Sequence, residues 1–141
     1  MKSKAPLALM EQLVMVLVFA LAAALCLQVF VLSDRMSQRG EARDHAVIQV
    51  QNAAETIKNC GGDLKKCAEL LGGTCDETVW QIGYDAGWKQ VTAEESTYLV
   101  RAVQIESGDP LLGMAEVSAG TADGDVLFAV TAAWQEVTAD E

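Results

Sequence analysis

An apolar stretch near the amino terminus constrains this chain more than any other feature. It covers residues 7–32 and reads LALMEQLVMVLVFALAAALCLQVFVL. Glu11 is its only formally charged residue, and no charge follows until after Leu32. As a helix, about 20 apolar residues rise about 30 Å, which matches the hydrocarbon core of a bilayer. The stretch therefore predicts one transmembrane helix over residues 7–32, in contact with membrane lipid.

Neither a cleaved secretory signal nor a lipoprotein anchor accounts for this stretch. A cleaved secretory signal has an apolar core of about 7–15 residues, which is shorter than this run. The segment at 22–26, AAALC, resembles a lipoprotein cleavage site ending in Cys26, but Leu25 stands where such sites have Gly, Ala or Ser. Cys26 is therefore expected to be one more apolar residue of the span.

Basic residues on both sides of the span bear on its orientation. Lys2 and Lys4 precede it without an acidic residue between them, which favours a cytoplasmic amino terminus and an extracytoplasmic carboxyl-terminal part. Arg35, Arg39 and Arg43 follow the span and favour the reverse. On the first signal we expect a single-pass protein of the plasma or inner membrane, with its amino terminus inside.

Charge is distributed unevenly along the chain. Residues 1–44 hold five basic and four acidic residues, whereas residues 45–141 hold five basic and sixteen acidic ones, a balance of −11. An acidic domain repels nucleic acid and anionic lipid headgroups, so neither is expected as its partner. A well-solvated surface accounts for this acidity most simply.

Glu11 is the residue of the span whose presence requires a reason. A carboxylate inside the hydrocarbon is costly, less so near its edge, and marks a functional position by default. The alternative is that Glu11 lies one turn inside the headgroup region, where it is solvated or protonated. Residue type alone does not decide between the two.

The segment LALMEQLVMVLVFALAAAL has a short basic leader before it and a continuing amphipathic helix after it. In this it resembles the amino-terminal part of type IV pilin-like proteins, which include the pseudopilins of type II secretion systems. The resemblance covers about the first 55 residues. The family has Gly and Phe where this chain has Pro6 and Leu7.

The resemblance implies a processing and assembly scheme. Residues 1–6 would be the leader that a prepilin peptidase removes between Pro6 and Leu7, with methylation of the new amino terminus. Glu11 would then be the fifth residue of the mature chain. Its carboxylate would pair with the α-amino group of a neighbouring subunit in a filament, which offsets the desolvation of both charges. The implied partners are other pilin-like subunits and their assembly machinery.

Beyond the membrane, residues 33–59 predict a continuation of the same helix, from near Leu7 to about Asn59. Val47, Val50, Ala54 and Ile57 recur at helical spacing and predict an apolar stripe packed on a domain. Gly40 is the only helix breaker in this part and a candidate flexible point.

Residues 60–77 predict a helical loop. Asp63 is a good N-cap for a short helix over residues 64–71, closed by Gly72-Gly73. Cys60, Cys67 and Cys75 are spaced by seven and eight residues, unlike the paired cysteines of structural zinc, so neither metal nor cofactor is expected. Outside the membrane two of them can form a disulfide, and Cys60–Cys75 is the preferred pair. Three free, packed thiols are the alternative.

Residues 78–141 predict an antiparallel sheet. Trp80, Ile82 and Tyr84 alternate, and β-rich runs follow at residues 98–105 and 112–119. The last run alternates most cleanly, and its residues are expected to face the core: Val126, Phe128, Val130, Ala132 and Trp134. Short turns favour a meander. Asp123 and Asp125 flank Gly124 and are expected to form a solvated turn rather than a calcium site, since no Glu follows at the EF-hand distance.

Together these patterns predict an α+β, pilin-like fold, with a long amino-terminal helix packed on a small antiparallel sheet. No enzyme is expected, because His45, the only histidine, has no nucleophile or acid placed beside it by any motif. The expected function is that of a structural pilin-like or pseudopilin subunit, held in the membrane before filament assembly. The alternative is an unprocessed single-span protein whose extracytoplasmic domain binds a ligand or partner.

Overall fold

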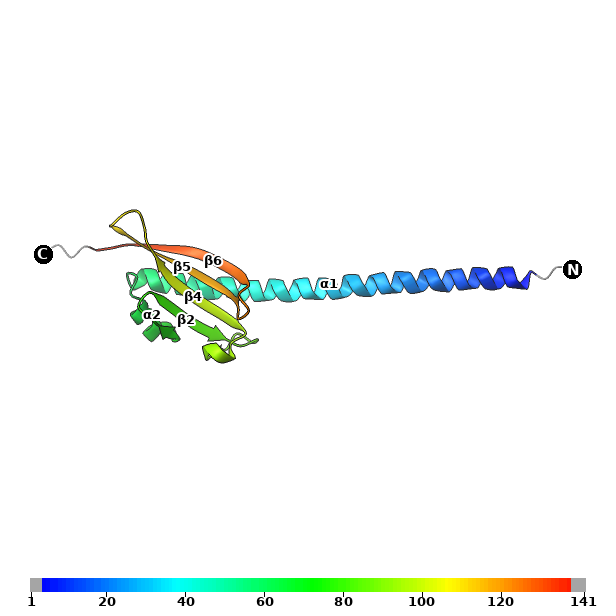
Figure 1. Cartoon of the computed structure of the whole chain (residues 1–141), viewed down its shortest axis with the longest axis horizontal. Helices are drawn as coiled ribbons and strands as arrows, with labels where there is room; N and C mark the ends of the chain where they lie inside the picture. Colours follow the sequence, from blue (N-terminus) through cyan, green and yellow to red (C-terminus); the bar gives the residue numbers. More distant parts are fainter. Residues whose placement is uncertain (1–3, 138–141) are drawn as a thin grey trace. The chain divides into compact units, whose positions relative to one another are not determined.

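The structure is a computed structural model and describes residues 4–137 of the chain. Helix α1 runs over Ala5–Asn59 and helix α2 over Leu64–Leu71 (Figure 1). The chain divides into two compact units, a first that ends at Gly40 and a second that begins at Glu41.

In the first unit, every described residue up to Gly40 is exposed. Helix α1 is long and apolar enough to cross a membrane, which agrees with the predicted span. Gly40 is helical, and a Cβ placed on it would meet nothing within 4 Å. Because α1 is one unbroken helix over Ala5–Asn59, the predicted continuity from near Leu7 to Asn59 is confirmed.

In the second unit, the last turns of α1 supply one side of the core. The predicted stripe is confirmed at Val50, Ala54 and Ile57, whereas Val47 is only half-buried and lies at its margin. Ala46 and Ala53 are buried as well, so small side chains complete the packed face of the helix.

Local capping signals end α1 and delimit α2. Gly62 has a φ of 83°, and its N–H donates to the carbonyl of Ile57 at 2.9 Å, which closes the last turn of α1. The Asp63 carboxylate accepts hydrogen bonds from the backbone N–H groups of Lys65 and Lys66, as predicted for an N-cap. Gly72 ends α2 by donating to the carbonyl of Ala68.

The sheet is antiparallel throughout, with strand order β1-β2-β4-β5-β6 and β3 beside β2. Successive long strands are neighbours, which confirms the meander. Between β3 and β4 lies a short 3₁₀ helix, η1 (Ala93–Glu95). The strands are β1 (Thr74–Cys75), β2 (Val79–Tyr84), β3 (Gln90–Val91), β4 (Tyr98–Ile105), β5 (Leu112–Thr121) and β6 (Val126–Gln135).

The core lies between the sheet and the last turns of α1, with α2 beside it. Trp80, Ile82 and Val100 are almost fully buried. The prediction fails at Val126, which is 66% exposed. A register shift between Ala119 and Gly120 changes the alternation there, and Leu127 packs against the core instead.

A second correction concerns where the sheet begins. The helical loop predicted over residues 60–77 contains α2 but also β1, whose Thr74 and Cys75 pair with Gln81 and Trp80 of β2. The α+β fold predicted from the sequence, a long helix packed on a small antiparallel sheet, is confirmed.

Candidate functional site

Glu11 and the predicted processing position lie in the first turns of α1. Pro6 is the second residue of the helix, where its missing N–H and fixed φ are tolerated. Leu7 and Glu11 are four residues apart and therefore share one face of the helix. Both are exposed. Among residues 4–137, no ion pair or hydrogen bond engages the Glu11 carboxylate.

The three cysteines of the second unit come from three different parts of the chain. Cys60 follows α1, Cys67 lies in α2 and Cys75 in β1. Cys67 is fully buried, and Cys60 and Cys75 are half-buried against the same core. All are free thiols, so the Cys60–Cys75 disulfide stays a prediction. The Cys75 thiol donates to the carbonyl of Asp76 at 3.0 Å.

Burial decides the chemistry of Cys67. It raises the pKa of this thiol to about 12, and the neighbouring Cys60, Asp63 and Cys75 act in the same direction. A thiol with so high a pKa stays protonated at neutral pH and is a poor nucleophile. Cys67 therefore has the properties of a packed, structural thiol.

An aromatic cluster gathers around Trp88. Its indole stacks on Tyr98 with ring centroids 4.4 Å apart and on His45 at 5.6 Å. The Tyr84 ring lies 5.7 Å from the indole and is tilted against it. Tyr84 is tied to α1 because its hydroxyl donates to the Gln49 side chain at 3.1 Å, and burial raises the pKa of this phenol. The only histidine is thus part of an aromatic stack.

This cluster depends on a turn at residues 85–88 whose left-handed residue the sequence does not reveal. Trp88 has a φ of 59°, in the left-handed region. The Asp85 carboxylate holds the turn by accepting hydrogen bonds from the N–H groups of Gly87 and Lys89, both at 2.9 Å. The signal that was present is the aspartate before Ala86-Gly87, which is typical of such Asx turns.

Two of the surface pockets of the second unit are candidate binding sites. One of about 560 Å³ lies along β2 and β3. None of its lining residues is titratable, so it offers no general acid or base. They are Gly73, Thr74, Gln81, Ile82, Gly83, Gln90, Val91, Thr92 and Ala93.

The other pocket, of about 290 Å³, lies at the end of β6. Its rim includes the carboxylates of Glu106, Asp109 and Glu136. Over residues 4–137, no three His, Cys, Asp or Glu side chains are placed to hold a metal ion together. Asp123 and Asp125 lie in the β5–β6 turn, where the Asp125 carbonyl accepts from the Thr121 N–H at 2.8 Å.

Comparisons of this chain with protein-family models, with curated proteins and with solved structures find no match.

Proposed function

We propose that this protein is a structural, non-enzymatic subunit of a type IV pilin-like or type II secretion-like filament, held in the membrane before assembly. One observation carries the proposal. Glu11 is a lone carboxylate on an otherwise uncharged, fully exposed helical span, and the same helix continues into an α+β domain.

A carboxylate in the hydrocarbon of a membrane is costly unless a partner compensates its charge. In a single subunit Glu11 has no partner among the described residues, so its desolvation in a membrane is uncompensated. In a filament, the α-amino group of a neighbouring mature chain would lie beside it and offset the desolvation of both groups. A charge that is a liability in the monomer thus becomes a contact that fixes the register of subunits.

The remaining parts of the proposal concern topology and processing. The amino terminus is cytoplasmic and the α+β domain extracytoplasmic, and a prepilin peptidase cleaves between Pro6 and Leu7. The partners are membrane lipid, other pilin-like subunits and their assembly machinery. A non-enzymatic role is supported by the inert thiol of Cys67, the stacked His45 and a larger pocket without titratable groups.

The test is a complementation assay in the native host, scoring membrane level and assembled material. Glu11→Leu is expected to insert at least as well as the wild type but to fail to enter filaments. Gln28→Leu is the matched control, because it also replaces an exposed polar residue of the span by leucine. It is expected to assemble normally. Equal assembly of Glu11→Leu at equal membrane level would rule out the proposed mechanism.

The second candidate is an unprocessed single-span protein whose domain binds a partner. The exposed Glu11 then has no role, and the Glu11→Leu variant behaves as the wild type. Mass spectrometry of the amino terminus of the protein from its host separates the two further. A mature chain starting at Leu7 supports the filament subunit, and an intact leader supports the single-span protein.

A further inference from the structure

The two edges of the sheet differ in length and protection. On one side, β1 and β3 are two-residue strands that lie beside β2. On the other side, β6 has ten residues, and within residues 4–137 it pairs with β5 alone (Figure 1). A long open edge presents backbone donors and acceptors to which another chain can add a strand.

The register identifies which backbone groups face the open edge. In an antiparallel pair, residues that exchange hydrogen bonds alternate with residues that do not. The Glu136 N–H donates to the Leu111 carbonyl at 2.9 Å, so these two residues form a hydrogen-bonded pair. The preceding residue, Gln135, is the last of β6 and therefore belongs to a pair that exchanges no hydrogen bond. By alternation, the N–H and C=O groups of Ala129, Thr131, Ala133 and Gln135 point outward. Their side chains are exposed.

Most of β6 lacks the devices that normally protect an edge. Its sequence, VLFAVTAAWQ, contains no proline and no charged residue. The one irregularity in its pairing lies opposite Ala119 and Gly120, at the turn, and leaves the strand regular from Phe128 to Gln135.

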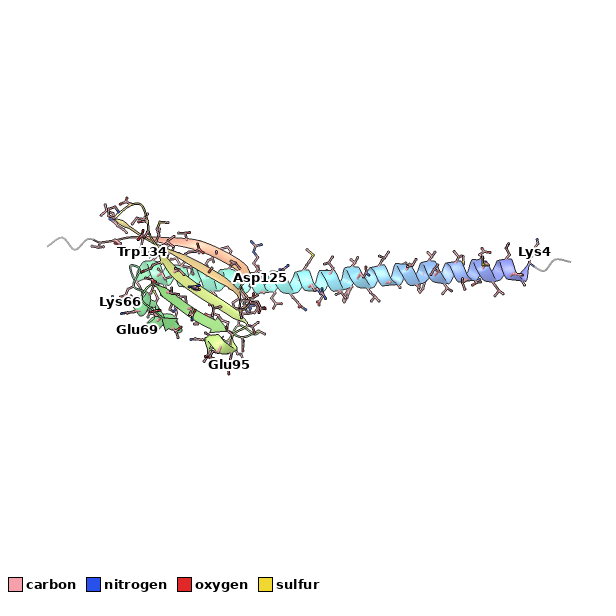
Figure 2. All side chains as sticks on the ribbon, viewed as in Figure 1. Lys4, Lys66, Glu69, Glu95, Asp125 and Trp134 are labelled. Carbon is pink, nitrogen blue, oxygen red and sulfur yellow. The ribbon has the colours of Figure 1, made fainter. Side chains whose placement is uncertain are left out.

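The charges around this edge select its partner. No Lys, Arg or His follows Arg101 in the chain. Asp125 immediately precedes β6 and Glu136 follows it, while Glu116 of β5 lies opposite Thr131 (Figure 2 labels Asp125 and Trp134, near the two ends of the strand). A second copy of β6, in either direction, would bring acidic ends together, which is unfavourable. A strand with basic ends complements the edge.

We propose that the outer edge of β6 binds an extended segment of another protein, uncharged in its middle and carrying lysine or arginine at both ends, by adding it to the sheet as a further strand. The backbone groups of the outward-facing residues supply affinity, and the acidic ends supply selectivity. This binding does not depend on the filament role.

The test uses the full chain in nonionic detergent micelles and a labelled peptide, Lys-Lys-Thr-Val-Thr-Val-Thr-Lys-Lys, with binding measured by fluorescence anisotropy. We expect this peptide to bind at least about tenfold more tightly than its Glu-flanked counterpart at low salt, with the preference shrinking as salt is added. Asp123→Asn/Asp125→Asn/Glu136→Gln should remove the preference. Equal binding of both peptides, or of neither, would overturn the proposal.

A matched pair of variants tests the role of the backbone. Ala133→Pro removes one outward N–H and should weaken binding at least about tenfold, whereas Ala133→Val keeps it and should bind within about twofold of the wild type. Circular dichroism checks that both fold. If the proline variant unfolds, two N-methylated peptides test the role of the backbone instead, each methylated on one of the two alternate sets of residues. Only the peptide whose methyl groups block the N–H groups that face β6 should lose binding. Unchanged binding by folded Ala133→Pro, or a dimer through β6 without peptide binding, contradicts the proposal.

Discussion

The indole of Trp134 lies directly against the backbone of Gly113, its cross-strand neighbour: a Cβ on Gly113 would stand 2.2 Å from the indole Nε1. A Cβ on Gly62 would come equally close, 2.2 Å from Cζ2. Because two glycines flank the ring, it has little room to shift. We expect Gly113→Ala to lower the free energy of unfolding by about 1–3 kcal/mol.

Denaturant unfolding of the full chain in micelles measures this loss. Gly108→Ala is the control, because a Cβ there meets nothing within 4 Å, and it should change stability by less than about 0.5 kcal/mol. In a Trp134→Ala background, Gly113→Ala should cost much less, since the ring it clashes with is gone. Additive losses would show that the two residues are not coupled.

Trp134 itself is 8% exposed, and its replacement by alanine is expected to cost about 3–5 kcal/mol. Its indole N–H is buried without a hydrogen-bond partner among the described residues. Trp134→Phe removes that unsatisfied donor and should therefore cost clearly less than Trp134→Ala. The same unfolding experiment compares the two. A loss under about 1 kcal/mol for the alanine variant would mean that β6 does not pack as described.

Substitutions of Asp63 distinguish the contribution of its capping hydrogen bonds from that of its charge. Its carboxylate accepts from the N–H groups of Lys65 and Lys66 at 3.1 and 3.3 Å, and its ion pair with the Lys66 ammonium is exposed at 3.9 Å. Asp63→Ala should cost about 1 kcal/mol, and Asp63→Asn much less, because asparagine also caps. Equal losses in thermal unfolding would assign the effect to charge.

The predicted Cys60–Cys75 bridge closes a loop of some fifteen residues and should stabilise the domain by about 3 kcal/mol. Non-reducing peptide mapping of protein from its own host identifies the linked pair. Unfolding with and without reductant measures its contribution. A bridge that contains Cys67, or three thiols alkylated without reductant, contradicts the prediction.

The raised pKa of Cys67 predicts alkaline destabilisation. The thiol titrates near 9.0 when unfolded and near 12 in the folded protein, so its stabilisation is complete below pH 9 and is lost as pH rises toward 12. Between these pH values the free energy of unfolding should fall with a slope that approaches about 1.4 kcal/mol per pH unit. Tyr84, whose pKa burial also raises, contributes in the same direction, so the comparison is made in a Tyr84→Phe background. There, Cys67→Ala should flatten the slope. An unchanged slope would contradict this assignment.

Elements with local signals were predictable from the sequence. Helix α2 follows from Asp63 before it and Gly72 after it, and the long strands follow from alternating apolar residues. The membrane-compatible part of α1 follows from composition alone. Each of these features depends on residues that are neighbours along the chain.

Features that depend on distant contacts were not predictable. β1 is a strand only because Thr74 and Cys75 meet β2, and Val126 is exposed because of a register shift near Gly120. The aromatic stack needs the left-handed conformation of Trp88, which the sequence does not show. For the candidate sites, Glu11 stands out in the sequence as the only charge of the span, whereas the open edge of β6 emerges only once strand order is known.

The full burial of Cys67 has a consequence for the dynamics of the domain. While this thiol is free, it reacts with an alkylating reagent only when α2 separates from the sheet or the whole domain unfolds. Its labelling rate, compared with that of the same thiol in the denatured chain, therefore reports the free energy of that opening under native conditions. The chain thus carries, at its second helix, a native probe of local unfolding.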